Sequence, residues 1–522
     1  MYRNLLSVAG MTLLSRMTGF LRDVMLGAVL GAGALADAFY IAFRLPNHFR
    51  AIFGEGAFNA AFVPSYARVL ESESMSDARR FAGQILTLLL ISQLVMLALA
   101  WAFTPQLVEL LAPGLSNDPG QMSAAVTMTR ITFPYLLFIT LVTLFSGVLN
   151  AHGKFAAAAF SPVLLNVVMI GFLAVAAYFP NAGIAASFGI AVAGVLQLVL
   201  LLAAARGSGI LGGFARPRWS ADVKQFFSAL GPAVIGSAGV QIALFVDTII
   251  GSMLPTGGIS SIYYADRIYQ LPIGVIGIAA GTVLLPEMSR RLSSGDTGGA
   301  LYAQNRTMAL TIALSAPFFV AFTLMPDLIM RAVFLHGRFT EEAAEASARV
   351  LCAYGFGLFA IVLIRSAVAS FQSRGDTRTP MLISLAAVGI NVLLKLVLFT
   401  PFGAAGLASA TAAGAWINFG LLTILAIRAG AMQPDSLLAR VTLATALASC
   451  LLAGVAIFGM APAVQVASMF GSFAVEGQLA LIGTAGLLAY GATLFVILRL
   501  LGVRPGKLKP LPRSVAAPPA EI

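Results

Sequence analysis

Uncharged apolar runs long enough to cross a lipid bilayer recur along this chain, and they limit its fold more than any other feature. A helix needs about 20 apolar residues to span the hydrocarbon core, and the runs 82–103 and 225–246 meet that length without a charged side chain. Longer runs are divided by turn-forming sequences, namely FPNAG at 179–183, TPFG at 400–403 and APA at 461–463. The sequence therefore predicts an all-α, polytopic membrane protein.

Composition agrees with this class. Of the 522 residues, 59% are hydrophobic and 10% are charged, whereas a soluble domain carries roughly 25% charged residues. We predict fourteen transmembrane helices, at 4–30, 35–66, 81–104, 124–150, 157–178, 183–204, 225–252, 260–288, 305–332, 346–372, 380–399, 404–427, 439–460 and 478–501. The first is interpreted as an uncleaved helix, because Arg16 interrupts its apolar run and no convincing cleavage site follows.

Basic residues in the predicted loops and tails fall almost entirely on one side of the membrane. By the positive-inside rule, both termini are then cytoplasmic. The net charge of +11 is mostly this topology signal, which argues against a nucleic-acid partner. The cysteines and histidines are scattered and give no metal-binding spacing, so no metal is expected.

A weak internal repeat divides the chain. Asp23 and the glycines after it have the same spacing as Asp247 and its glycines, and a Leu-Pro pair follows in each half, at 45–46 and 271–272. Two parallel six-helix units are predicted, which is a transporter architecture with two pseudo-symmetric lobes around a central cavity. The expected domains are an N-terminal lobe at 1–205, a C-terminal lobe at 206–430, two extra helices at 431–501 and a basic cytoplasmic tail at 502–522.

Nine basic residues fall inside predicted helices, where each costs roughly 2.5–3.5 kcal/mol on insertion scales. They are Arg16, Arg22, Arg44, Arg50, Arg130, Arg267, Arg349, Arg365 and Lys395. Pairing with neighbouring acids is the structural explanation for each one. The acids predicted at the same depth are Asp23, Asp37, Glu55, Asp247 and Asp266. About four positive charges are then left without a partner, and a cavity with unpaired arginines recruits an anion such as a phosphate group.

No nucleotide-binding sequence of the GxxxxGK[ST] type is present, so we expect no cofactor, no enzymatic activity and transport driven by an ion gradient or the membrane potential. Asp247 and Asn391 offer oxygen ligands that suit sodium. Lys395 lies one turn after Asn391, and we expect it to occupy the place of the cation and to form a built-in ion pair with Asp247. The alternative is that Lys395 reaches an interface and never meets Asp247.

Three stretches resemble signature blocks of the MurJ/MviN lipid II flippases, within the multidrug/oligosaccharidyl-lipid/polysaccharide exporter superfamily. They are DAFYIAFRLPNHFRAIFGEGAFNAAFVP at 37–64, SRMTGFLRD at 15–23 and YYADRIYQLPIGVIGIAAGTVLLPEMS at 263–289. The resemblance implies the inner membrane of a bacterium and alternating access. It implies outward flipping of the undecaprenyl-diphosphate-linked peptidoglycan precursor for cell-wall synthesis, with functional contact to cell-wall synthesis proteins. It also implies that the two extra helices form a groove for the lipid tail.

The resemblance carries a set of functional positions onto this chain. The expected substrate-binding residues are Arg16, Arg22, Asp37, Arg50 and Arg267, and the expected supporting residues of the cavity are Ser15, Asp23, Arg44, Glu55 and Asp266.

Three other functions stay open. A multidrug/cation antiporter of the same superfamily would favour acidic residues in the cavity, where this chain has a basic surplus. A flippase for another polyprenyl-linked oligosaccharide fits the buried arginines equally well. A non-transporting scaffold for cell-wall enzymes would have no reason to keep unpaired basic residues at membrane depth.

Overall fold

A computed structural model gives the fold, and it describes residues 2–50 and 57–503. Every regular element in these ranges is helical. The chain forms two compact units. Unit 1 comprises 1–268, 330–351 and 388–410, and unit 2 comprises 269–329, 352–387 and 411–522.

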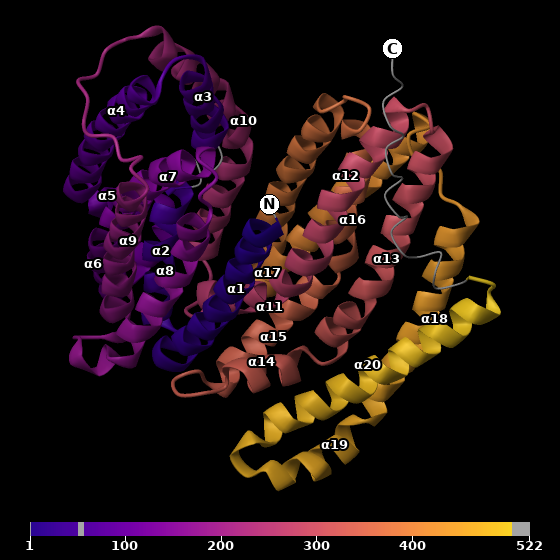
Figure 1. Ribbon diagram of the computed structural model, residues 1–522. Helices are drawn as coiled ribbons and strands as arrows, with labels where there is room; N and C mark the ends of the chain where they lie inside the picture. Colours follow the sequence, from indigo (N-terminus) through magenta and orange to yellow (C-terminus); the bar gives the residue numbers. More distant parts are fainter. Residues whose placement is uncertain (1, 51–56, 504–522) are drawn as a thin grey trace. The chain divides into compact units, whose positions relative to one another are not determined.

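Unit 1 is built mainly from the first eleven α-helices. These are α1 (Tyr2–Leu30), α2 (Ala34–Arg50), α3 (Ala57–Ser72), α4 (Met75–Ala102), α5 (Thr104–Leu111), α6 (Pro119–Thr132), α7 (Pro134–Ala151), α8 (Ala156–Ala174), α9 (Ala182–Gly207), α10 (Ala221–Ser252) and α11 (Gly258–Pro272). Helix α8 packs between α1 and α9, while α2 packs on α6, and α3 packs on α7 and α10 (Figure 1). Parts of α14 (Pro326–Phe334), α15 (Glu341–Gly355) and α17 (Arg378–Arg428) complete it.

Unit 2 centres on α13 (Thr297–Leu324), which contacts α12 (Ile278–Ser293), α16 (Leu358–Gln372) and α18 (Ser436–Phe458). Helix α18 in turn packs on α20 (Ala474–Leu500), and α19 (Met460–Ala467) connects the two (Figure 1). The contacts between α13, α18 and α20 are apolar, with Ala316, Ala448 and Tyr490 at their centre.

Two of the three predicted turns fall where helices end or bend, while APA at 461–463 lies inside α19, which begins at Met460 directly after the end of α18. Residues 175–181 separate α8 from α9, and the Asn181 side chain caps α9 by accepting from the Ile184 amide at 2.9 Å. The TPFG turn is a break at Gly403, whose φ of 55° suits glycine, inside the 51-residue helix α17.

Proline accounts for two departures from the predicted helices. The predicted helix 124–150 is divided into α6 and α7 at Pro134, which has no amide hydrogen to continue α6. The predicted helix 260–288 is divided into α11 and α12 by a π-helical turn, Ile273–Gly277, directly after Pro272. The predicted helix 35–66 corresponds to α2 and α3, and residues 51–56 between them lie outside the described residues.

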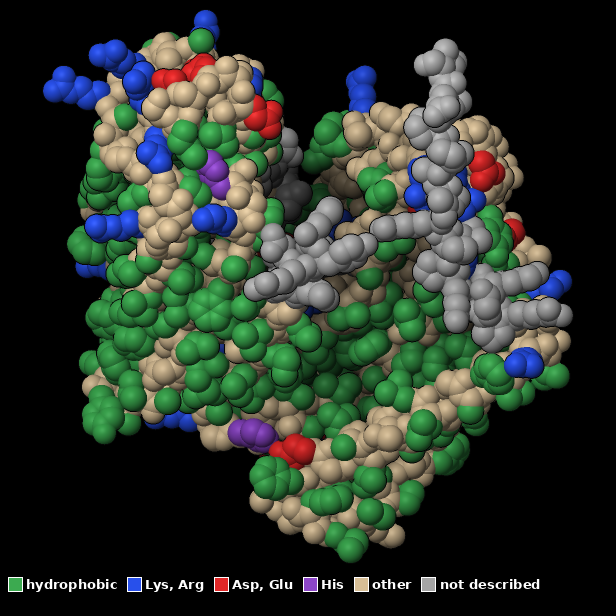
Figure 2. Space-filling view, viewed as in Figure 1, with side chains coloured by type: hydrophobic (Ala, Val, Ile, Leu, Met, Phe, Trp, Pro, Cys, Tyr) green, Lys and Arg blue, Asp and Glu red, His purple; other side chains and the backbone are tan. Residues whose placement is uncertain are grey.

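Within the described ranges, ten helices are long and apolar enough to cross a membrane; α1, α2, α3 and α10 are not among them. Figure 2 shows hydrophobic side chains over broad areas of the visible face of each unit. Exposed examples are Leu94 and Val95 on α4 and Leu443 and Leu447 on α18. Exposed apolar side chains on helices of this length are what a lipid environment requires, so the chain is a multi-pass membrane protein.

Candidate functional site

Arg22 and Asp23 of α1 form a buried ion pair within unit 1. Arg22 Nη2 lies 2.7 Å and Nε lies 3.0 Å from Asp23 Oδ1. The third guanidinium nitrogen, Nη1, donates to Oδ1 of Asn166 on α8 at 2.8 Å. All three nitrogens of the guanidinium therefore have partners, which a buried charge requires. Pairing with a neighbouring acid, which is the structural alternative to substrate binding for Arg22, is therefore present.

Aromatic rings surround this pair. Tyr263 of α11 donates its hydroxyl to Asp23 Oδ1 at 3.0 Å, and its ring stacks on Tyr40 of α2 with the ring centroids 3.9 Å apart. Arg267 Cζ lies 4.7 Å from the centroid of the Tyr263 ring, a cation–π contact. Arg267 also donates to Asp266 Oδ2 at 3.3 Å, as expected. The cluster thus joins α1, α2, α8 and α11, which are labelled in Figure 1.

The carboxylate of Asp37 on α2 binds the beginning of α11. It accepts from the backbone amides of Gly257 at 2.6 Å and Ser260 at 2.8 Å, and from the Ser260 hydroxyl. These amides belong to the first turn of a helix, which leaves its amides without partners inside the helix itself. Asp37, expected to bind substrate, is therefore engaged as a cap that ties α2 to α11.

Asn166, like Tyr263 and Tyr40, belongs to this site although the sequence did not single it out. Its Nδ2 donates to the Ser15 carbonyl at 3.0 Å and to Thr18 Oγ1 at 3.3 Å, while its Oδ1 holds Arg22. Gly19 makes this approach possible, since a Cβ there would lie 3.3 Å from Asn166 Nδ2. The available signal was a lone amide in an otherwise apolar helix, where it needs hydrogen-bond partners.

Other expected site arginines are less engaged. Arg16 is exposed and Arg44 is half-buried, and neither makes a hydrogen bond or an ion pair with any residue in the described ranges. Arg50 ends α2, but its side chain is not described, and Glu55 lies outside the described residues. Within the expected site, Arg16, Arg44 and the Nε of Arg267 are therefore the described groups open to an anion, and this Nε is buried without a hydrogen-bond partner in the described structure.

Of the other three arginines predicted inside helices, one forms an ion pair and two do not. Arg349 binds Glu345 at 2.7 Å, and both side chains are more than half exposed. Glu345 was not counted among the acids at membrane depth. Arg130 and Arg365 are exposed, and their guanidinium groups have no partner among the residues the structure describes.

Lys395 and Asp247 form the ion pair expected between α17 and α10, with Nζ 2.5 Å from Oδ1. The Lys395 side chain is 5% exposed and that of Asp247 is 35% exposed. Asn391 donates its side-chain amide to the Ala410 carbonyl at 2.9 Å. Among described residues, no group of three or more histidine, cysteine, aspartate or glutamate side chains is placed to hold a metal ion.

These observations define a class. A multi-pass membrane protein that keeps a cluster of arginine, aspartate and tyrosine side chains in its interior has the arrangement of a membrane transporter for a charged substrate. Comparison with known proteins gives the family: the chain belongs to the MurJ lipid II flippases. The model of the family described as "Lipid II flippase MurJ" matches residues 26–477.

Curated relatives agree with this assignment. The chain is 42% identical over 422 residues to a "Probable lipid II flippase MurJ" of Rhizobium meliloti (strain 1021), covering 80% of this chain and 78% of the relative. It is 34% identical over 444 residues to the "Lipid II flippase MurJ" of Burkholderia cenocepacia, covering 83% and 85%. The resemblance inferred from the sequence is confirmed.

Solved structures show the fold. A "Lipid II flippase MurJ, inward closed conformation" matches with a TM-score of 0.77 at 22% identity, covering 95% of this chain and 99% of that one. An inward-facing multidrug resistance MATE family transporter of the MOP superfamily matches with a TM-score of 0.66 at 13% identity, covering 83% and 99%. Both matches show that this chain shares its fold with these two solved proteins.

Proposed function

We propose that this chain flips lipid II, the undecaprenyl-diphosphate-linked peptidoglycan precursor, from the cytoplasmic to the periplasmic leaflet for cell-wall synthesis. The observation that carries the proposal is 42% identity, over four fifths of this chain, to a relative named as a probable lipid II flippase. The arginines of unit 1 supply the chemistry, because guanidinium groups donate paired hydrogen bonds that match the oxygens of a diphosphate.

The arginines divide into two roles in this proposal. Arg16 and Arg44 make no hydrogen bond or ion pair with described residues, and the Nε of Arg267 is buried without a hydrogen-bond partner. These three therefore meet the diphosphate first, together with Arg50. The guanidinium nitrogens of Arg22 already donate to Asp23 and Asn166. Arg22 can therefore bind the substrate only if its hydrogen bond to Asn166 is replaced by one to phosphate.

The architecture proposed for this activity is fourteen transmembrane helices in two six-helix lobes around a central cavity, with alternating access to the two leaflets. Both termini are cytoplasmic, and the membrane is the inner membrane of a bacterium. Helices α18 and α20 carry the lipid tail. Cell-wall synthesis proteins receive the product.

The energy source proposed is the membrane potential. Lys395 places a fixed ammonium beside Asp247, the carboxylate that an alkali cation would otherwise approach. Transport should therefore proceed without sodium, and Lys395→Ala should disable it.

The experiment that tests the function is depletion with complementation. Cells that depend on this chain are depleted of it, and the lipid-linked precursors of the cytoplasmic leaflet are identified. Accumulation of lipid II, reversed by the wild-type chain, supports the proposal. Accumulation of another polyprenyl-linked oligosaccharide, or sensitivity to organic cations without any precursor accumulating, rejects it.

A further inference from the structure

His48 of α2 is a buried titratable residue of unit 1 that lies one helical turn after Arg44. Its Nε2 lies 3.0 Å from Oγ1 of Thr248 on α10, and its ring centroid lies 4.8 Å from that of Phe245. His48 is 7% exposed and Thr248 is 1% exposed. An imidazole held by these contacts has one orientation, so the state of each ring nitrogen can be assigned from the hydrogen-bond network.

The hydrogen bond to Thr248 assigns the tautomer of His48. The Thr248 hydroxyl has one hydrogen, which it donates to the Leu244 carbonyl at 2.9 Å, so its oxygen accepts from His48. Nε2 therefore carries the hydrogen of the neutral ring, and Nδ1 carries a lone pair. Nδ1 makes no hydrogen bond with any residue that the structure describes. A second proton would bind at Nδ1 and would leave the contact with Thr248 intact.

The charge of Arg44 opposes this second proton. Residues four apart lie on the same face of a helix, with about 5–6 Å between their Cβ atoms. Arg44 makes no hydrogen bond or ion pair with a described residue, so its charge is not compensated there. Two positive charges at this spacing repel each other in the low-dielectric interior of a protein. An anion bound to Arg44 cancels the repulsion and also attracts a proton to His48.

The helices packed most closely on α2 are α6, α7, α9 and α10. Asp247 of α10 precedes Thr248 in the chain, but its carboxylate is paired with Lys395 at 2.5 Å. The other titratable side chains described on α2 and on these helices are Asp37, Tyr40, Arg130, Tyr135, Arg206, Asp222 and Lys224. Among the charges that the structure describes, Arg44 is the one that acts on the imidazole of His48.

We propose that His48 binds one proton together with the substrate. When the diphosphate pairs with Arg44, Nδ1 of His48 takes a proton from water, and the proton returns to water when the diphosphate leaves. This inference rests on the proposed function, because it takes the diphosphate as the anion at Arg44. Uptake of a proton on binding makes the affinity for the substrate rise as the pH falls, by at most about tenfold per pH unit for one proton.

The test counts the protons taken up when the full chain, purified in detergent, binds lipid II. Binding heats are measured at about pH 6, where a histidine can titrate, in two buffers of different ionisation enthalpy. The difference between the heats gives the protons taken up per lipid II bound. We expect at least about 0.3 proton for the wild type, and fewer at about pH 8. His48→Gln keeps an amide donor for Thr248 but cannot titrate, so it should bind lipid II with an uptake near zero. Arg44→Gln should lower the count, because the proton is then no longer repelled before the substrate binds.

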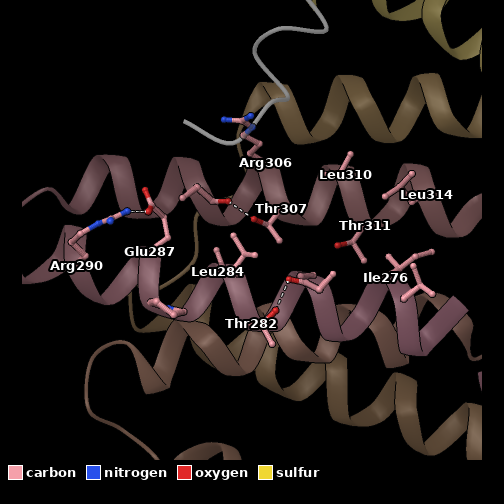
Figure 3. Close-up of a pocket in the computed structure, with 16 residues that line it drawn as sticks. Ile276, Thr282, Leu284, Glu287, Arg290, Arg306, Thr307, Leu310, Thr311 and Leu314 are labelled. Carbon is pink, nitrogen blue, oxygen red and sulfur yellow. Dashed lines mark hydrogen bonds and ion pairs between the residues drawn. The ribbon is translucent and has the colours of Figure 1, made fainter. Parts of the chain in front are cut away.

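Two matched controls should take up as many protons as the wild type. His336→Gln changes an exposed histidine between α14 and α15. Glu287→Gln removes a carboxylate of unit 2 that is paired with Arg290 beside the groove between α12 and α13, as Figure 3 shows. Binding of lipid II by the wild type without proton uptake, or an unchanged count in His48→Gln, overturns the inference and leaves the proposed function standing. If the wild type does not bind lipid II, the proposed function falls and this inference falls with it.

Discussion

The ion pair between Lys395 and Asp247 gives a quantitative prediction, because its two members are unequally buried. Replacing Asp247 by asparagine leaves an ammonium that is 5% exposed without its counter-ion. Breaking a buried pair in this way costs about 3–5 kcal/mol of unfolding free energy. Replacing Lys395 by methionine leaves a carboxylate that is 35% exposed and can be hydrated, so we expect a cost of about 1–3 kcal/mol.

The double variant Asp247→Asn/Lys395→Met removes both charges together. We expect it to come within about 1 kcal/mol of the wild type, since replacing a buried pair by neutral groups is often nearly neutral. The corresponding coupling energy, the sum of the two single costs less the cost of the double variant, is about 3–7 kcal/mol. Unfolding free energies measured in mixed detergent and SDS micelles give all four corners of this cycle.

A second cycle on Arg349 and Glu345 serves as the control. Both of these side chains are more than 60% exposed, so their coupling should be only about 0.3–0.5 kcal/mol. Equal costs for the two single variants at Lys395 and Asp247, or costs that simply add in the double variant, would refute the reasoning from burial.

Three further outcomes are expected. Asp37→Ala should cost about 1–3 kcal/mol of unfolding free energy, because the amides of the first turn of α11 lose their acceptor, and Asp37→Asn should cost less; equal losses in SDS unfolding would contradict the capping role. Gly31→Ala should fail to yield folded protein on size-exclusion chromatography, because φ is +72° and a Cβ would lie 2.6 Å from the Arg338 carbonyl, while Gly33→Ala, with open space around it, should behave as the wild type. The last outcome concerns single alanine variants at Arg16, Arg22, Arg50 and Arg267. Each should abolish complementation while the protein still inserts into the membrane. Full activity in two or more of these variants would exclude the set as the diphosphate site.

The helices follow from the sequence because lipid leaves few alternatives to them. Apolar length gives their positions, and FPNAG and TPFG give two of the turns, since asparagine caps α9 and Gly403 takes a positive φ. The sequence does not show which distant residue will contact a given polar side chain, because that contact depends on how the helices pack. Asp37 has the charge and depth of a binding residue, yet it caps a helix that begins 220 residues later. Asn166 lies in a largely apolar helix that gives no sign of a functional role, yet its side-chain oxygen accepts a hydrogen bond from Arg22.

The three ion pairs differ in the time at which they can form during synthesis. Two contain an arginine, Arg22–Asp23 and Asp266–Arg267, and the third is Asp247–Lys395. Arg22 and Asp23 are adjacent in the chain, as are Asp266 and Arg267, so each pair is complete when its own helix leaves the ribosome. Asn166 follows Arg22 by 144 residues, which at typical rates of synthesis is a delay of about 7–30 seconds. During that interval the neighbouring carboxylate already lowers the cost of placing α1 in the bilayer. Asp247 waits a similar time for Lys395, 148 residues later, and its helix α10 must enter the membrane with a carboxylate still unmatched. Early insertion of α10 is accordingly a step of biogenesis that carries the cost of a charge without its ion-pair partner.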